Sequence, residues 1–162
     1  ATAPVDTMSA PKGDHLAGVL ATIREPKSAR ILIGRRACHC CGRGGVDVRL
    51  IRAVIDLAER LGVDLEITSG YRCPEHNSKI PGAAKRSKHM AGSAVDIAIP
   101  EGIDPLDYYR AACEVVFLER GGIGIDPQRR FVHHDTGAKR RWAYKDGKQV
   151  PWSEVFPSTS AA

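Results

Sequence analysis

The chain has 162 residues, of which 43% are hydrophobic and 27% charged, and its formal net charge is +5. This composition is typical of one water-soluble globular domain and excludes a disordered chain. No apolar run reaches the roughly 20 residues that cross a bilayer, so we expect no membrane span. The first residues lack the features of a secretory signal, so we expect either a leader already removed or another export route, and the compartment stays open.

Three parts are expected along the chain. Residues 1–30 begin with recurring Pro and Gly and show weak periodicity, so they are predicted to form an extended N-terminal arm with a short helix at residues 15–23. Residues 31–156 carry regular patterns and form the predicted domain. Residues 157–162 are a frayed tail.

Helical periodicity predicts three helices after the arm. In the first, apolar side chains recur at helical spacing, Asp47 stands near the start and Gly62 follows the end. In the last, Asp104 precedes Pro105, a favoured pair at a helix start, and Gly121 closes the helix. The inward residues of this last helix are predicted to be Tyr109, Ala112, Cys113, Val116 and Phe117. The three ranges are 46–61, 74–80 and 104–119.

Alternating or β-rich runs predict the strands, at residues 64–68, 94–99, 123–125 and 131–134. The last two flank PQRR and indicate a hairpin, and a KDGK turn near Trp142, Tyr144 and Trp152 indicates another. The expected fold is therefore α+β, with two main helices covering a small antiparallel sheet that carries the metal site described next.

The most informative segment is SKHMAGSAVD, residues 87–96, which fits the pattern SxHxxGxAxD at every fixed position. A chance match arises on the order of once in a million windows. His89 ends a loop and Asp96 lies in the strand that follows, so an imidazole and a carboxylate can converge on one face of the sheet. FVHHDTG supplies a further histidine. In a strand, His133 and Asp135 point to one side and His134 to the other, so one of the two histidines faces the metal. Three protein ligands and a water are typical of a catalytic zinc site.

SGYRCPEHN, SKHMAGSAVD and GGIGIDPQRRFVHHDTG, in this order, resemble the zinc D-alanyl-D-alanine carboxypeptidases and endopeptidases, grouped with lysostaphin and hedgehog. The resemblance covers about residues 35–145. It implies that His89, Asp96 and His133 bind Zn²⁺, and that the substrate is the peptide stem or cross-link of bacterial peptidoglycan. It also implies action at the bacterial cell wall.

ACHCCG is similar to small phage-encoded and prophage-encoded members of this family, which implies either a virion-associated or an exported protein. The N-terminal arm and the C-terminal tail would then contact other virion or envelope proteins.

The resemblance implies metal-assisted amide hydrolysis and a general base three residues before the last histidine ligand, where the family has Glu and this chain has Arg130. Asp135 is the nearest remaining carboxylate and Asp126 a weaker one. Asp135 has an equally good alternative role, orienting a ligand through a hydrogen bond. Arg72 is predicted to bind the oxyanion or the substrate carboxylate. Ser87 is predicted either to bind near the site or to hold its loop.

Five cysteines cannot all pair within one chain. Cys38, Cys40 and Cys41 lie together, and two interpretations stay open. One is a structural zinc site with His39 and Cys73 as further ligands. The other, favoured because CHCC lacks the usual CxxC spacing, is a reduced or partly disulfide-bonded cluster.

Short basic groups at residues 85–88, 129–130 and 139–141 favour attraction to an anionic polymer or a substrate carboxylate. Nucleic acid is not the expected partner, because the few aromatic residues are not interleaved with these groups. A second class of function fits the lack of the upstream Glu: a catalytically weak or inactive zinc-fold module that binds the cell wall or serves as a structural component of a virion or envelope.

Overall fold

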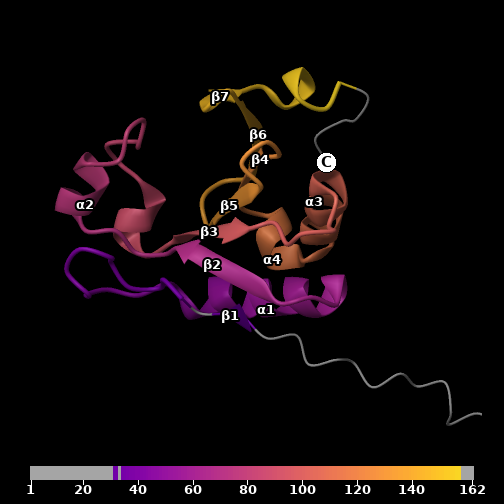
Figure 1. Cartoon of the computed structure of the whole chain (residues 1–162). Helices are drawn as coiled ribbons and strands as arrows, with labels where there is room; N and C mark the ends of the chain where they lie inside the picture. Colours follow the sequence, from indigo (N-terminus) through magenta and orange to yellow (C-terminus); the bar gives the residue numbers. More distant parts are fainter. Residues whose placement is uncertain (1–30, 33, 158–162) are drawn as a thin grey trace, which may run out of the picture.

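In the computed structural model, the described residues, 31–32 and 34–157, form one seven-stranded sheet with four α-helices (Figure 1). The predicted arm and its helix at residues 15–23 lie outside these residues, as does the tail from residue 158 onward. The α+β class is confirmed. Among the described helices, none is long and apolar enough to cross a membrane.

The sheet has the order β1-β2-β3-β5-β4-β6-β7 and is mostly antiparallel, as expected. Two pairs, β1 with β2 and β4 with β6, are parallel, which the sequence patterns did not indicate. The predicted hairpins are both present, as β4–β5 and β6–β7. The strands are β1 (Ile31–Leu32), β2 (Leu65–Ser69), β3 (Ala94–Ala98), β4 (Gly122–Asp126), β5 (Phe131–Asp135), β6 (Arg140–Lys145) and β7 (Lys148–Val150).

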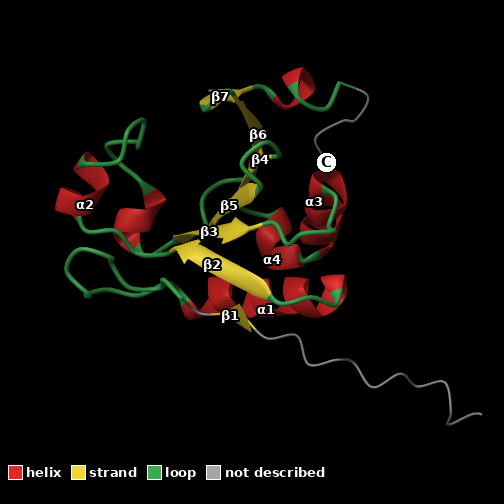
Figure 2. Ribbon diagram, in the orientation of Figure 1, coloured by secondary structure: helices red, strands yellow, loops and turns green. Residues whose placement is uncertain are grey.

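Helices and 3₁₀ turns connect the strands, and three of the helices pack together while α2 lies apart from them (Figure 2). One 3₁₀ turn, η2, lies in the segment GAAKRSKHMAGSA, residues 82–94, whose small and basic residues predict a loop. The helices are α1 (Val48–Leu61), α2 (Pro74–Ser78), α3 (Pro105–Glu114) and α4 (Val116–Glu119), and the 3₁₀ turns are η2 (Lys88–Ala91) and η3 (Trp152–Glu154).

Helix α1 is the best-specified element. Asp47 is its N-cap, and its side chain accepts a hydrogen bond from the Arg49 N–H. Gly62 ends the helix in the left-handed conformation with φ 67°, which a glycine adopts at little cost. The apolar face of α1, with Leu50, Val54 and Leu57 fully buried, packs on the sheet. The predicted helix is confirmed, with its start moved to Val48 because Asp47 caps it.

The single helix predicted for residues 104–119 is wrong, because the backbone is extended at Val115, where ψ is 105°. The chain turns there, so α3 and α4 are two separate helices. Val116, predicted to face inward, is 64% exposed, whereas Tyr108 and Leu118 are buried. Two consecutive β-branched residues at this point favour the break, because they have low helix propensity.

The two faces of the sheet differ in character. One face packs against α1, α3 and α4 and forms the core. Because side chains alternate along a strand, Asp96 on β3 and His133 on β5 lie on the opposite face. The sheet residues of the core are Leu65, Ile67, Val95, Ile97, Ile123, Ile125, Val132 and Ala143.

Candidate metal centre

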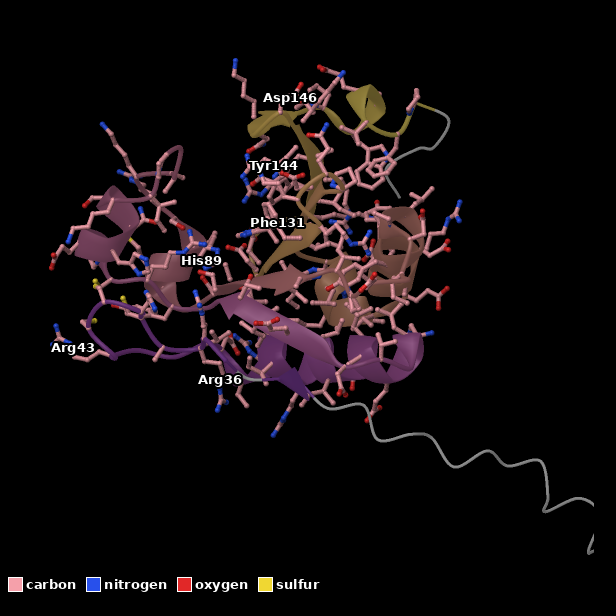
Figure 3. The ribbon with its side chains drawn as sticks, viewed as in Figure 1. Arg36, Arg43, His89, Phe131, Tyr144 and Asp146 are labelled. Carbon is pink, nitrogen blue, oxygen red and sulfur yellow. The ribbon has the colours of Figure 1, made fainter. Side chains whose placement is uncertain are left out.

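His89, Asp96 and His133 are brought together by three neighbouring elements. Asp96 and His133 are direct partners in the antiparallel β3–β5 pair, so their side chains stand side by side. His89 lies on η2, which Ser87 caps at its start and Gly92 closes with φ 66°. Figure 3 shows His89 where the segment that follows α2 meets the sheet.

The three facing atoms form a nearly regular triangle. Nδ1 of His133 lies 2.9 Å from Oδ1 of Asp96, Nε2 of His89 lies 3.3 Å from the same oxygen, and the two nitrogens are 3.3 Å apart. Tetrahedral zinc bonds of about 2.0 to 2.1 Å separate neighbouring ligands by about 3.3 Å. The triangle therefore has the size of one face of a zinc tetrahedron.

Hydrogen bonds on the far side of each ring determine which nitrogen carries a proton. Nδ1 of His89 lies 2.7 Å from the Gly70 carbonyl and donates to it, which leaves the lone pair of Nε2 facing Asp96. Nε2 of His133 lies 3.1 Å from Oδ2 of Asp135 and donates to it. Two nitrogen lone pairs and a carboxylate oxygen then point at one another, an arrangement that a divalent cation stabilises.

Asp96 stays ionised in this setting. Burial acts to raise the pKa of its carboxyl, but the adjacent imidazoles of His133 and His89 outweigh it and hold the pKa far below its usual range. Arg72 binds the other oxygen, Oδ2, and its Nε donates to Ser69 at 2.8 Å. Arg72 therefore fixes the Asp96 carboxylate so that Oδ1 faces the histidines.

The His133 ring lies between two carboxylates. Burial acts to lower its pKa, but the hydrogen bonds to Asp135 and Asp96 outweigh it and raise the pKa. A proton on Nδ1 or a metal ion there would each relieve the charge of Asp96. A metal ion, unlike a proton, can also be bound by the facing Nε2 atom of His89.

Asp135 has a fully buried side chain with three hydrogen-bond donors. Besides His133, Arg140 donates to Oδ2 at 2.9 Å, and the Gly137 N–H donates to Oδ1 at 2.7 Å. Burial acts to raise its pKa, but these donors lower it well below the usual range. Asp135 is thus an ionised carboxylate whose two oxygens are already engaged.

The other predicted residues lie in supporting positions. Ser87 accepts the His89 N–H at 3.3 Å and holds the turn. Arg130, at the position of the family Glu, donates to the carbonyls of Pro100 and Ile103. Asp126 is 1% exposed and accepts the Arg129 N–H at the β4–β5 turn.

His134 faces the core, as its strand position predicted. Its ring is 1% exposed, and Nε2 lies 3.2 Å from the Tyr108 hydroxyl. Burial lowers its pKa to about 3, so the ring is neutral at physiological pH.

An aromatic wall beside the site was not predicted from the sequence. Arg140, Trp142 and Tyr144 alternate along β6 and therefore share one face. The Trp142 ring centre lies 5.5 Å from that of His133, and the Arg140 guanidinium lies 4.7 Å from the Trp142 ring centre. The period-two pattern was the available signal, and the parallel pairing of β6 with β4 was the missing information.

A cavity of about 230 Å³ includes Gly70 and Arg72 in its lining, which contact His89 and Asp96, but none of the three triangle residues lines it. A larger cavity, of about 700 Å³, lies between α1 and α4 and includes none of the triangle residues.

Two comparisons with known proteins bear on the site. A sequence model of one protein family, peptidase M15, matches residues 32–135, which include all three residues of the triangle. Among curated relatives, the peptidoglycan L,D-endopeptidase MepK of Escherichia coli strain K12 is 38% identical over 82 residues, 48% of this chain and 43% of that protein. The probable peptidoglycan L,D-endopeptidase MepK of Haemophilus influenzae is 33% identical over 104 residues, 60% of this chain and 54% of that protein. The chain thus spans about half the length of these relatives.

Proposed function

Because this chain belongs to the peptidase M15 family, we propose that it hydrolyses amide bonds in the peptide stems or cross-links of bacterial peptidoglycan with a zinc ion held by His89, Asp96 and His133. The observation that carries the proposal is the triangle of two imidazole nitrogens and one carboxylate oxygen. Its size suits tetrahedral zinc, and its two imidazoles suit zinc better than magnesium or calcium, which prefer oxygen ligands.

The remaining residues would act around the metal. A bound zinc ion would supply polarisation of the scissile carbonyl and a water of lowered pKa. Arg72 positions Asp96 and Asp135 positions His133, each through a hydrogen bond to the atom that faces away from the triangle. Ser87 holds the turn that presents His89. This assigns Asp135 to orientation, because its oxygens already accept three hydrogen bonds.

The names of the relatives bear on the bond that is cut. Both are called L,D-endopeptidases, which favours an internal L,D bond over the D,D bond, terminal or internal, that the sequence resemblance implied. Action at the cell wall is part of the proposal. Both relatives are bacterial proteins, which favours export over delivery by a virion.

A second candidate function has a specific observation in its favour. Arg130 occupies the position of the family's base, and its guanidinium is bound to two carbonyls, while Asp135 is fully engaged. A module that binds zinc and peptidoglycan without turnover would need no free carboxylate as a general base. The first candidate predicts peptide products from peptidoglycan, and the second predicts binding to peptidoglycan without products.

Digestion of purified peptidoglycan, with product masses determined by mass spectrometry, tests the proposal. We expect the zinc-loaded chain to release peptides whose masses identify an L,D cut, and His133→Ala to release none. His39→Ala, which changes an exposed histidine, is the matched control and should retain full turnover. Binding to peptidoglycan without product from the zinc-loaded wild-type chain would favour the second candidate, and neither binding nor product would exclude both.

A further inference from the structure

Four cysteine sulfurs gather at a second place, away from the His89 triangle. The sulfurs of Cys38, Cys40, Cys41 and Cys73 all lie within 4.8 Å of one another. Figure 3 shows sulfur atoms, in yellow, between the loop that carries Arg43 and the short helix α2. The proposed peptidase site uses none of them.

Two separate segments build this cluster. Cys38, Cys40 and Cys41 lie in a tight turn, in which the Cys38 N–H donates to Arg43 and the Gly42 N–H donates to Cys38. Gly42 has φ 66°, so the turn needs a residue that tolerates the left-handed conformation. Cys73 comes from the far segment, where it is the N-cap of α2.

The spacing of the sulfurs fits metal binding better than a disulfide. Cys40 Sγ lies 3.2 Å from Cys73 Sγ and 3.5 Å from Cys38 Sγ, well beyond the bond of about 2.05 Å in a disulfide. Tetrahedral zinc bonds of about 2.3 Å place neighbouring sulfurs about 3.8 Å apart. Cys40 and Cys41 are exposed, so their side chains can shift to reach that distance from the other two sulfurs.

The surroundings suit thiolates. The Cys73 N–H points to Cys38 Sγ at 3.3 Å, and the His76 N–H points to Cys73 Sγ at 3.4 Å. The positive charges of two side chains interact electrostatically with the cluster, Arg43 with Cys41 and Lys79 with Cys40 and Cys73. Backbone donors and nearby cations stabilise the negative charge of a metal–thiolate centre.

His39, the ligand considered from the sequence, is not part of the group. It is exposed, and Cys41 stands in its place among the four. His76 instead approaches the cluster, with Nδ1 3.4 Å from Cys38 Sγ, and is placed to hydrogen-bond that sulfur.

We propose that Cys38, Cys40, Cys41 and Cys73 bind one structural zinc ion, separate from the ion of the peptidase site. Four soft thiolates leave no open position, which is typical of a structural zinc and not of a catalytic one. Cys73 directly follows Arg72, which holds Asp96, and the Tyr71 N–H donates to Arg36 in the cysteine-bearing loop. The ion thus fastens this loop to the segment that positions a ligand of the peptidase site.

Zinc content per chain, measured by elemental analysis of protein purified under reducing conditions, tests this. We expect two zinc ions in the wild-type chain, one in Cys73→Ser and one in His133→Ala. Cys113→Ser changes a thiol outside the cluster and should retain both. Equal zinc in Cys73→Ser and the wild-type chain would overturn the proposal.

Cobalt(II) substitution covers the case in which Cys73→Ser does not fold. In His133→Ala, cobalt bound to the cluster should show the sulfur-to-metal charge-transfer absorption of a tetrahedral thiolate site. A cobalt complex without that absorption, or a disulfide among the four cysteines in zinc-loaded wild-type protein, would also contradict the proposal. Neither readout requires peptidase activity, so the outcome is independent of the proposed function.

Discussion

Asp135 and His133 are joined by a hydrogen bond of 3.1 Å between Oδ2 and Nε2, on the edge of the ring that faces away from Asp96. The bond places the proton of His133 on Nε2 and leaves Nδ1 for a metal ion. Asp135, two positions along the same strand, therefore determines which ring nitrogen of His133 carries the proton.

If Asp135 orients His133, its removal will weaken zinc binding. We expect Asp135→Ala to raise the zinc dissociation constant about 10- to 100-fold, the usual effect of losing such an outer partner. Asp135→Asn keeps an acceptor and should retain more of the affinity. Competition with a chromophoric chelator measures both constants. Full zinc affinity in Asp135→Asn combined with complete loss of turnover would instead identify Asp135 as the general base.

Arg72 is expected to act through Asp96. Arg72→Ala leaves Oδ2 of a buried carboxylate without its cation, so we expect weaker zinc binding and a lower kcat at subsaturating zinc. Excess zinc should then restore much of the rate. Binding of the substrate carboxylate, the role implied by the sequence, would raise KM at every zinc concentration and leave zinc affinity unchanged. Titration of activity with zinc separates the two roles.

Gly124 makes room for the aromatic wall. It pairs with His133 on one side and Trp142 on the other, and a Cβ atom at this position would overlap the Trp142 ring. We expect Gly124→Ala to lower the free energy of unfolding by about 1 to 3 kcal/mol, as overpacking does. Gly45→Ala is the matched control, because a Cβ there meets nothing within 4 Å. Chemical denaturation measures both; equal stability of the two variants would contradict this packing.

The cap of α1 predicts a dependence on pH. Hydrogen bonds from the Arg49 side chain and N–H lower the pKa of Asp47. Its stabilising effect is therefore complete above the unfolded value, about 3.9, and is lost as the pH falls through the lower folded pKa.

We expect Asp47→Ala to cost about 1 kcal/mol at pH 7, and less in acid. Asp47→Asn keeps the cap without the charge, so the difference between it and the wild-type chain should shrink as the pH falls. Denaturation curves at several pH values test this, and a difference that stays constant in acid would exclude the ionised cap.

Local patterns in the sequence predicted the elements that depend on neighbouring residues. Asp47 and Gly62 bound α1 because a cap and a left-handed residue act within one turn, and alternation placed His133 and His134 on opposite faces. The end of α3 was missed because the extended backbone at Val115 does not interrupt the apolar pattern.

Contacts between distant segments could not be predicted in the same way. The sequence placed Arg72 near the site but not on Asp96, because that contact depends on how β2 and β3 pair. Cys73 likewise joins the CHCC turn from 33 residues away, across the segment that contains α1 and β2. Pairing of strands and packing of loops decide such contacts, and neither leaves a short-range pattern.

The most direct test of the account is anomalous X-ray diffraction at the zinc edge from crystals of the zinc-loaded chain. We expect an ion bound to Nε2 of His89, Oδ1 of Asp96 and Nδ1 of His133 at about 2.0 to 2.2 Å, with one position open to solvent. An anomalous map without a peak at this triangle, or with a fourth protein atom in the open position, would contradict the proposed peptidase centre.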